Sequence, residues 1–161
     1  MMAKINDYII DRDIRAMNWL KHFAEVAKLV STMSKDPAKK IGVVIVDKNK
    51  RIISTGFNGF PKGIKDTKDR LENKEYKRAI TLHAEENAIL YAKQDLSGCE
   101  MYIYGLPPCS HCAAMIIQSG ISAVYYTLPK EYEISDHWKE NLKIAEDILE
   151  EAKIPLLELN I

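Results

Sequence analysis

Long hydrophobic runs are missing from the sequence. No apolar stretch approaches the roughly 20 residues that a helix needs to span a membrane. The first residues, MMAKINDYIIDRD, carry too many charges to form the apolar core of a signal peptide. These two absences lead us to expect a cytoplasmic protein that has no membrane partner.

Cysteine is scarce, and net charge is absent. Only 3 of the 161 residues are cysteine, and two of these, Cys109 and Cys112, form a C-x-x-C motif. An odd number in this arrangement argues against a secreted disulfide scaffold. Because 23 Lys and Arg balance 23 Asp and Glu, the formal charge is +0, which argues against a dedicated nucleic-acid binder. The length, with no repeat or linker, predicts a single domain over residues 1–161.

Hydrophobic spacing predicts the order of the secondary-structure elements. Apolar residues at helical spacing predict a helix over about 13–33, and two β-branched runs, 41–47 and 51–57, predict a hairpin. The pattern then predicts a polar loop over 58–77, a helix over 85–93, a strand over 101–105, a helix over 109–119, a strand over 121–127, a helix over 138–152 and a strand over 154–159. Single helices between strands imply parallel neighbours after the hairpin. We therefore expect an α/β fold, a three-layer α/β/α sandwich around a five-stranded mixed sheet.

The stretch LPPCSHCAAM, residues 106–115, concentrates residue types that bind metals. Cys109 and Cys112 are three residues apart, so they share one face of the first turn of a helix. Free backbone N–H groups and the helix dipole favour thiolates at that position. His111 is offset from both cysteines and is expected to lie outside the metal's coordination shell. Two thiolates are too few, because a catalytic zinc takes three protein ligands and a water.

A second stretch, TLHAEENAI at 81–89, supplies the missing groups. His83 precedes a helix and is the best third ligand, and Glu85 follows two residues later, near whatever the histidine binds. Zinc lowers the pKa of a water in the fourth position to about 7, and Glu85 would shuttle its proton. The order H-x-E followed by P-C-x-x-C is the general signature of zinc nucleobase deaminases. A purely structural zinc is the alternative that this joint pattern disfavours.

The tryptophans and the remaining histidine and cysteine residues are interpreted as structural. Trp19 and Trp138 fall in expected helices, where aromatic residues usually pack. His22 and His137 have no ligand partner nearby in sequence and are interpreted as surface or packing residues. Cys99 stands alone and is expected to be a small buried residue.

Three stretches resemble the cytidine and deoxycytidylate deaminase superfamily. HAEENAI (83–89) and PPCSHCAAMI (107–116) carry the catalytic motifs, and TGFNGFPKG (55–63) looks like the G-[YF]-N-G-x-P loop of deoxycytidylate (dCMP) deaminases. The resemblance covers about residues 13–127. It implies a cytidine deaminase-like fold and a hydrolase that converts dCMP to dUMP with release of ammonia.

The resemblance also assigns roles to single residues. It implies one Zn²⁺ per subunit, held by His83, Cys109 and Cys112. Glu85 would be the proton shuttle, Asn58 would contact the substrate sugar, and backbone groups near Ala84 would hold the pyrimidine edge. Because Asn-Gly is a common turn pair, a simple turn role for Asn58 stays open.

Several functional alternatives remain open at this point. The chain could deaminate another nucleotide, nucleoside or base, such as cytidine, adenosine in tRNA or guanine. It could also be a catalytically inactive, zinc-stabilised binding module, which the presence of Glu85 disfavours. The resemblance further implies a homo-oligomer, hexamers being frequent in the family. Allosteric control by dCTP or dTTP is implied only through the loop at Asn58.

The phosphate site is where the sequence departs from its relatives. Some dCMP deaminases carry a basic residue eleven positions after the zinc histidine, whereas this chain has Gln94 there, beside Lys93. Residues 61–78 hold seven Lys and Arg against four Asp and Glu. Arg70 and Arg78 are the candidates for the phosphate, because arginine makes bidentate contacts with phosphate oxygens. Pairing of these arginines with nearby glutamates on the surface is the alternative.

Overall fold

The computed structural model describes residues 14–161. Its strands are β1 (Gly42–Val46), β2 (Ile52–Phe57), β3 (Glu100–Tyr104), β4 (Ala123–Thr127) and β5 (Leu156–Glu158). Its helices are α1 (Ile14–Ser31), α2 (Lys68–Glu72), α3 (Lys74–Ile80), α4 (Ala84–Ala92), α5 (Ser110–Ser119) and α6 (Asp136–Glu151). Within the described part, none of these helices has the length and apolar character that a membrane crossing requires.

The five strands form one mixed sheet in the order β2-β1-β3-β4-β5. β1 pairs antiparallel with both β2 and β3, whereas β3 with β4 and β4 with β5 are parallel pairs. The predicted five-stranded mixed sheet is confirmed. Because β3 and β4 run in the same direction, they end at the same edge of the sheet, and α5 and α6 follow them there.

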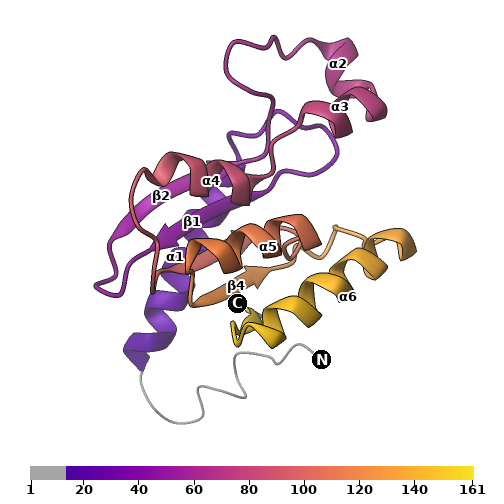
Figure 1. The fold of residues 1–161 in the computed structure, drawn as a ribbon. Coiled ribbons are helices and arrows are strands. Elements are labelled where there is room, and N and C mark those ends of the chain that lie inside the picture. The colour runs from indigo at the N-terminus through magenta and orange to yellow at the C-terminus, as the bar shows by residue number, and fades with distance from the viewer. Residues whose placement is uncertain (1–13) are drawn as a thin grey trace.

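Helices cover both faces of the sheet, which explains why β1 is apolar throughout (Figure 1). Side chains alternate between the faces of a strand. Val43 and Ile45 pack in the cluster that α4, α5 and α6 cover, and Val44 and Val46 pack in the cluster under α1. The predicted three-layer α/β/α arrangement is therefore confirmed.

The expected polar loop over 58–77 is wrong in one respect, because it contains α2 and the first part of α3. The side chain of Thr67 accepts a hydrogen bond from the Arg70 N–H, and that of Asn73 accepts one from the Tyr76 N–H, so each helix begins at a capped residue. Neither helix buries a residue, which is why hydrophobic periodicity missed both. In Figure 1 they stand apart from the sheet layers.

Gly56 fixes how closely α4 approaches β2. A Cβ atom on this residue would lie 2.3 Å from the backbone oxygen of Ala84 and 2.5 Å from the backbone nitrogen of Ala88. Any side chain here would therefore push α4 away from the sheet. Gly56 thus lets the first turn of α4, which holds His83 and Glu85, pack directly against β2.

Candidate active site

Three potential metal ligands converge from two helix N-termini. His83 is the N-cap residue of α4, Cys109 is the N-cap residue of α5, and Cys112 lies in the first turn of α5. The Nδ1 atom of His83 is 3.5 Å from the Sγ of Cys109 and 3.4 Å from the Sγ of Cys112. All three ligand atoms lie within 4.8 Å of one another, so the residues are arranged to hold one metal ion.

These separations fit zinc. A tetrahedral ion with Zn–S bonds of about 2.3 Å and Zn–N bonds of about 2.0–2.1 Å holds its sulfur and nitrogen ligands about 3.5 Å apart. The measured Nδ1–Sγ distances of 3.4 and 3.5 Å agree with that value. Three protein ligands also leave the fourth position that a catalytic zinc uses for water.

The three ligand residues also shift one another's pKa values. A hydrogen bond from the Cys112 thiol, helped by His83, lowers the pKa of Cys109 to about 4. The same bond and burial raise the pKa of Cys112, and the bond to Cys109 raises the pKa of His83 to about 9. The pKa values of the two thiols are thus shifted in opposite directions. A dication lets both cysteines bind as thiolates.

Glu85 lies beside this cluster without belonging to it. It is the second residue of α4, its side chain is buried with only 4% of the residue exposed, and its Oε2 atom lies 3.3 Å from the Sγ atom of Cys112. Burial raises the pKa of the carboxyl group. A raised pKa brings a carboxyl group closer to neutral pH, where a general acid/base works best.

His111 lies on the other side of the same helical turn. Its side chain is exposed, and it is not part of the group of three ligands. Cys99, directly before β3, is buried in the hydrophobic core and is not part of the group of three ligands. His22 and His137 are exposed. The position of each agrees with its interpretation from the sequence.

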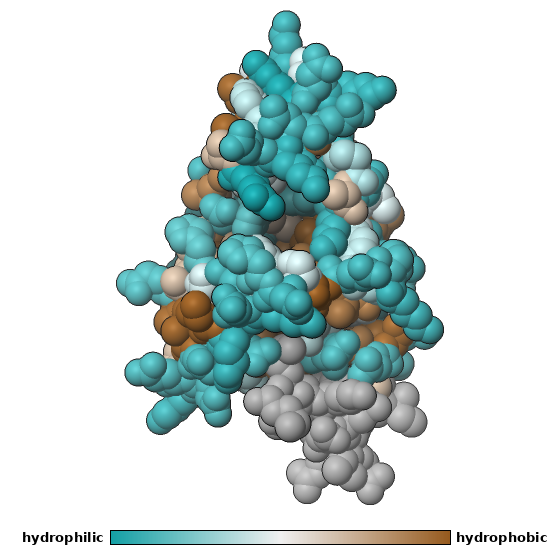
Figure 2. All heavy atoms as spheres, turned by 90° about the vertical axis from the view of Figure 1, so that its right-hand side faces the viewer, coloured by the Kyte–Doolittle hydropathy of each residue, from teal (hydrophilic) through white to brown (hydrophobic). Residues whose placement is uncertain are grey.

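A cavity of about 470 Å³ opens over the metal-ligand group. This volume lies within the range of about 300–1,000 Å³ that is typical of small-molecule sites. Its lining includes His83, Ala84, Glu85 and Cys109. Figure 2 shows a hollow on one face of the molecule, with hydrophobic side chains inside it and hydrophilic ones around it.

Asn58 lines this cavity, but its side chain also has a structural task. Its Oδ1 atom accepts a hydrogen bond from the Ile41 N–H, and its Nδ2 group donates one to the Lys39 carbonyl, both 2.9 Å long. The residue is 8% exposed. An amide nitrogen carries two hydrogens, so Asn58 retains one donor for a ligand.

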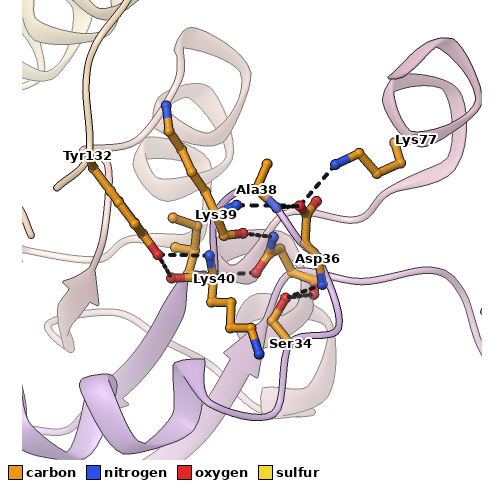
Figure 3. Close-up of polar contacts among 9 residues, drawn as sticks. Ser34, Asp36, Ala38, Lys39, Lys40, Lys77 and Tyr132 are labelled. Atoms are coloured by element: carbon orange, nitrogen blue, oxygen red, sulfur yellow. Dashed lines mark hydrogen bonds and ion pairs between the residues drawn. The ribbon is translucent and has the colours of Figure 1, made fainter. Parts of the chain in front are cut away.

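The segment 34–41 forms one wall of the cavity, and the contacts that fasten it include three that are drawn in Figure 3. One fastening is to Asn58. At the second, Asp36 forms an ion pair of 2.9 Å with Lys77 of α3, and each side chain is only 15% exposed. At the third, the Tyr132 hydroxyl accepts a hydrogen bond from the Lys40 N–H and donates one to the Lys40 carbonyl.

The two arginines proposed for the phosphate lie in different surroundings. Arg78 of α3 lines the cavity. Arg70 does not, because its Nη1 group donates to the Lys65 carbonyl at 3.1 Å and its guanidinium lies over the Tyr76 ring. In the described structure, Glu72 pairs with Lys68, and no ion pair within 4 Å joins either arginine to Glu72 or Glu75, so the alternative of surface pairing is not seen.

Lys93 and Gln94 lie far from the metal group within this subunit. Lys93 ends α4 in the left-handed conformation, with φ of 55°, and Gln94 follows outside the helix. The nine residues of α4 span about 13 Å, so both side chains start from the end opposite His83. Neither residue lines the cavity over the metal-ligand group.

Sequence reasoning missed part of the lining. Trp138 of α6, interpreted as a packing residue, lines the cavity, and its indole N–H is buried without a hydrogen-bond partner in the described structure. Lys39 and Lys74 line it too. Basic composition pointed to the region around Lys74. No local signal in the sequence marks Lys39 or Trp138, because tertiary packing alone brings them to the site.

A metal site with one open position, beside a buried carboxyl group that can carry protons, is built to hydrolyse a bond with activated water. On this fold, that arrangement defines the class of zinc-dependent hydrolytic deaminases. Residues 17–128 match the family described as "Cytidine and deoxycytidylate deaminase zinc-binding region". The chain belongs to this family.

Curated relatives agree with this assignment. The chain is 46% identical over 136 residues to an uncharacterised deaminase in the luxG 3′ region of Aliivibrio fischeri, covering 84% of this chain and 90% of that one. It is 37% identical over 123 residues to the deoxycytidylate deaminase of Homo sapiens, covering 73% and 68% of the two chains.

One solved structure is similar over nearly its whole length. The dCMP deaminase from the cyanophage S-TIM5, in complex with dCMP and dUMP, superposes with a TM-score of 0.66 at 26% identity. The match covers 91% of this chain and 98% of that one. The predicted cytidine deaminase-like fold is therefore confirmed.

Proposed function

We propose that the protein deaminates a cytosine mononucleotide, with dCMP as the substrate and dUMP and ammonia as the products, and that residues 1–161 act as one deaminase domain. The main support is that the metal-ligand group and a set of cationic side chains line one cavity. The solved relative with dCMP and dUMP and the deoxycytidylate deaminase relatives also support this substrate.

His83, Cys109 and Cys112 would hold the zinc, which when bound lowers the pKa of a coordinated water and so supplies the nucleophile. Glu85 would then act as the general acid/base that transfers the protons. It would take one proton from the water and give it to N3 of the base as the water oxygen bonds to C4. It would then move the proton of the new C4 hydroxyl to the amino group, whose bond to C4 breaks as ammonia leaves. Water and cytosine thereby become uracil and ammonia.

Ala84 would position the base during this reaction. It is the first residue of α4, it is buried, and it lines the cavity. The first N–H groups of a helix have no acceptor within the helix, so they are donors available to a ligand. The backbone here suits the polar edge of a pyrimidine, and the spare donor of Asn58 suits a sugar hydroxyl.

Cationic side chains of the cavity would bind the 5′-phosphate. Lys74, Lys77 and Arg78 come from α3, and Lys39 comes from the segment 34–41. Because Asp36 already neutralises Lys77, the other three supply the charge for the phosphate. Arg78 is the strongest candidate among them, since its planar guanidinium can bind two phosphate oxygens at once.

Charge reversal tests whether Arg78 or Arg70 binds the phosphate. Arg78→Glu is expected to raise the KM for dCMP by about 10- to 100-fold, because a hydrogen bond to a charged group contributes about 1.5–3 kcal/mol. The KM for deoxycytidine, which has no phosphate, should change little. Arg70→Glu is the matched control, since Arg70 lies outside the cavity, and its kinetics should stay close to wild type. Steady-state kinetics on both substrates measure the difference.

Two outcomes would contradict this assignment. If Arg78→Glu handles dCMP as the wild type does, the phosphate lies elsewhere. If the wild type itself has a higher kcat/KM for deoxycytidine than for dCMP, the monophosphate hypothesis fails.

An ammonia-release panel tests the proposed function as a whole. Zinc-loaded protein would be assayed with cytosine, deoxycytidine, CMP, dCMP, dCTP, adenosine and guanine. The highest kcat/KM is expected for dCMP. A preference for adenosine or guanine would favour another branch of the class, and no release from any compound would favour an inactive binding module.

Three further predictions accompany this function. The chain is expected to act in the cytoplasm, to form a homo-oligomer, with a hexamer as the form that the family resemblance suggests, and to respond to dCTP or dTTP. A second cavity of about 540 Å³ lies against the 55–63 stretch and shares Asp36, Asn58 and Thr81 with the first. An effector in it would contact residues that also line the active site.

A further inference from the structure

The side chain of Asn141 in α6 makes two contacts with the turn that carries the cysteine ligands. Its Oδ1 atom accepts a hydrogen bond of 2.9 Å from the backbone N–H of Ser110. Its Nδ2 group donates one of 2.9 Å to the Ser110 hydroxyl. Ser110 directly follows Cys109 and begins α5. The Asn141 amide thus hydrogen-bonds to both the main chain and the side chain of Ser110.

We propose that Asn141 is a positioning residue for the metal site, which holds Cys109 and Cys112 in the orientation that zinc requires. The inference rests on the proposed zinc ligands, but not on the identity of the nucleotide.

Other contacts of the turn lie within α5 itself, such as the hydrogen bond of 2.8 Å from the Ala113 N–H to the Cys109 carbonyl. Cys109 is extended, with φ of −69° and ψ of 170°, and its Sγ accepts a hydrogen bond of 3.4 Å from the Cys112 N–H. The N–H of Ser110 has no acceptor within α5, because it belongs to the first turn of the helix. A side chain 31 residues away along the chain supplies that acceptor. The residue next to Cys109 is therefore tied to α6.

The contact should matter more for the metal than for folding. Ser110 and Asn141 are both only half-buried, so water can replace the lost hydrogen bonds when one partner is removed. Water cannot, however, hold the cysteine ligands in the orientation that zinc requires. Groups that orient metal ligands commonly change metal affinity by about 10- to 100-fold when they are mutated.

The position of α6 adds to this inference. The family match ends at residue 128, whereas α6 comprises Asp136–Glu151. Trp138, three residues before Asn141 and on the same face of the helix, lines the cavity. This helix therefore contributes to the site from outside the matched region, with one residue at the cavity and one at the ligand turn.

The test compares Asn141→Ala with Leu149→Ala. Leu149 is a buried residue of the same helix, 1% exposed, that packs in the hydrophobic core eight positions beyond Asn141. Zinc-loaded proteins would be mixed with a chromogenic chelator, the zinc release rate would be followed, and the melting temperature would be measured separately. Asn141→Ala should release zinc about tenfold faster or more, with a small loss of melting temperature. Leu149→Ala should lose more melting temperature and release zinc at close to the wild-type rate.

Two further variants make the result decisive. Asn141→Asp keeps an acceptor for the Ser110 N–H and should release zinc more slowly than Asn141→Ala. Ser110→Ala removes the other partner of the side-chain contact and should also release zinc faster than the wild type. It replaces Asn141→Ala in the test if that variant is too unstable to purify. Wild-type release rates in both Asn141→Ala and Ser110→Ala, or equally fast release in Leu149→Ala, would overturn the proposal. Wild-type protein that binds no zinc would refute the ligand set instead.

Discussion

Glu85→Gln is expected to keep its fold and its zinc and to lose nearly all deamination. Glutamine has almost the shape of glutamate, but it cannot take up or release a proton. A general acid/base commonly contributes about 10²–10⁴-fold to the rate, and two proton transfers would pass through this one residue. The loss in kcat should therefore be at the upper end of that range or beyond it. Ammonia release with dCMP measures the effect, and metal analysis verifies that zinc is retained.

The neighbouring residue provides a matched control. The Oε1 atom of Glu86 accepts a hydrogen bond of 3.0 Å from the His83 N–H, so Glu86 helps to begin α4 but does not line the cavity. Glu86→Gln retains an acceptor oxygen and should deaminate within a few-fold of wild type. If Glu85→Gln turns over every substrate as fast as the wild type, Glu85 is not the proton carrier.

The sequence predicted the centre of the site because its geometry is local. His83 and Glu85 are two residues apart at the start of one helix, and Cys109 and Cys112 are three apart at the start of another. Helix N-termini impose nearly fixed side-chain directions, so spacing alone indicates which groups face each other. The exposed position of His111 follows from the same reasoning.

The sheet was predictable for a similar reason, except for its order. Alternation and β-branched runs marked the strands of the hairpin. The antiparallel pairing of β3 with β1 was not predicted, because it depends on where the chain crosses between layers. That pairing leaves β2 at the edge and places α4 beside it.

The walls of the cavity could not be predicted from local patterns. Lys39 and Trp138 are separated by almost a hundred residues, and only tertiary packing brings them to one cavity. Arg70 and Arg78 appeared equivalent in sequence. The capped start of α3 places Arg78 at the cavity, whereas Arg70 lies against Tyr76. For Asn58, the resemblance implied the proposed sugar contact, but its motif could not reveal the hydrogen bonds to Lys39 and Ile41.

The second large effect concerns zinc itself. His83→Ala and Cys112→Ser are each expected to reduce the zinc content from about one ion per chain to well below it after dialysis, because two protein ligands do not hold zinc firmly. His111→Ala is the matched control, since His111 lies next to Cys112 but faces solvent. It should retain about one zinc per chain. Metal analysis by mass spectrometry gives the counts.

Stability should follow the metal content, because a ligand that binds only the folded state stabilises it in proportion to the logarithm of its free concentration over its Kd. The melting temperature of wild type and of His111→Ala should therefore fall when a strong chelator is added. His83→Ala should start from a lower value and respond little to the chelator. Loss of zinc from His111→Ala, with retention in His83→Ala, would reverse the ligand assignment and place the metal on the solvent side of α5.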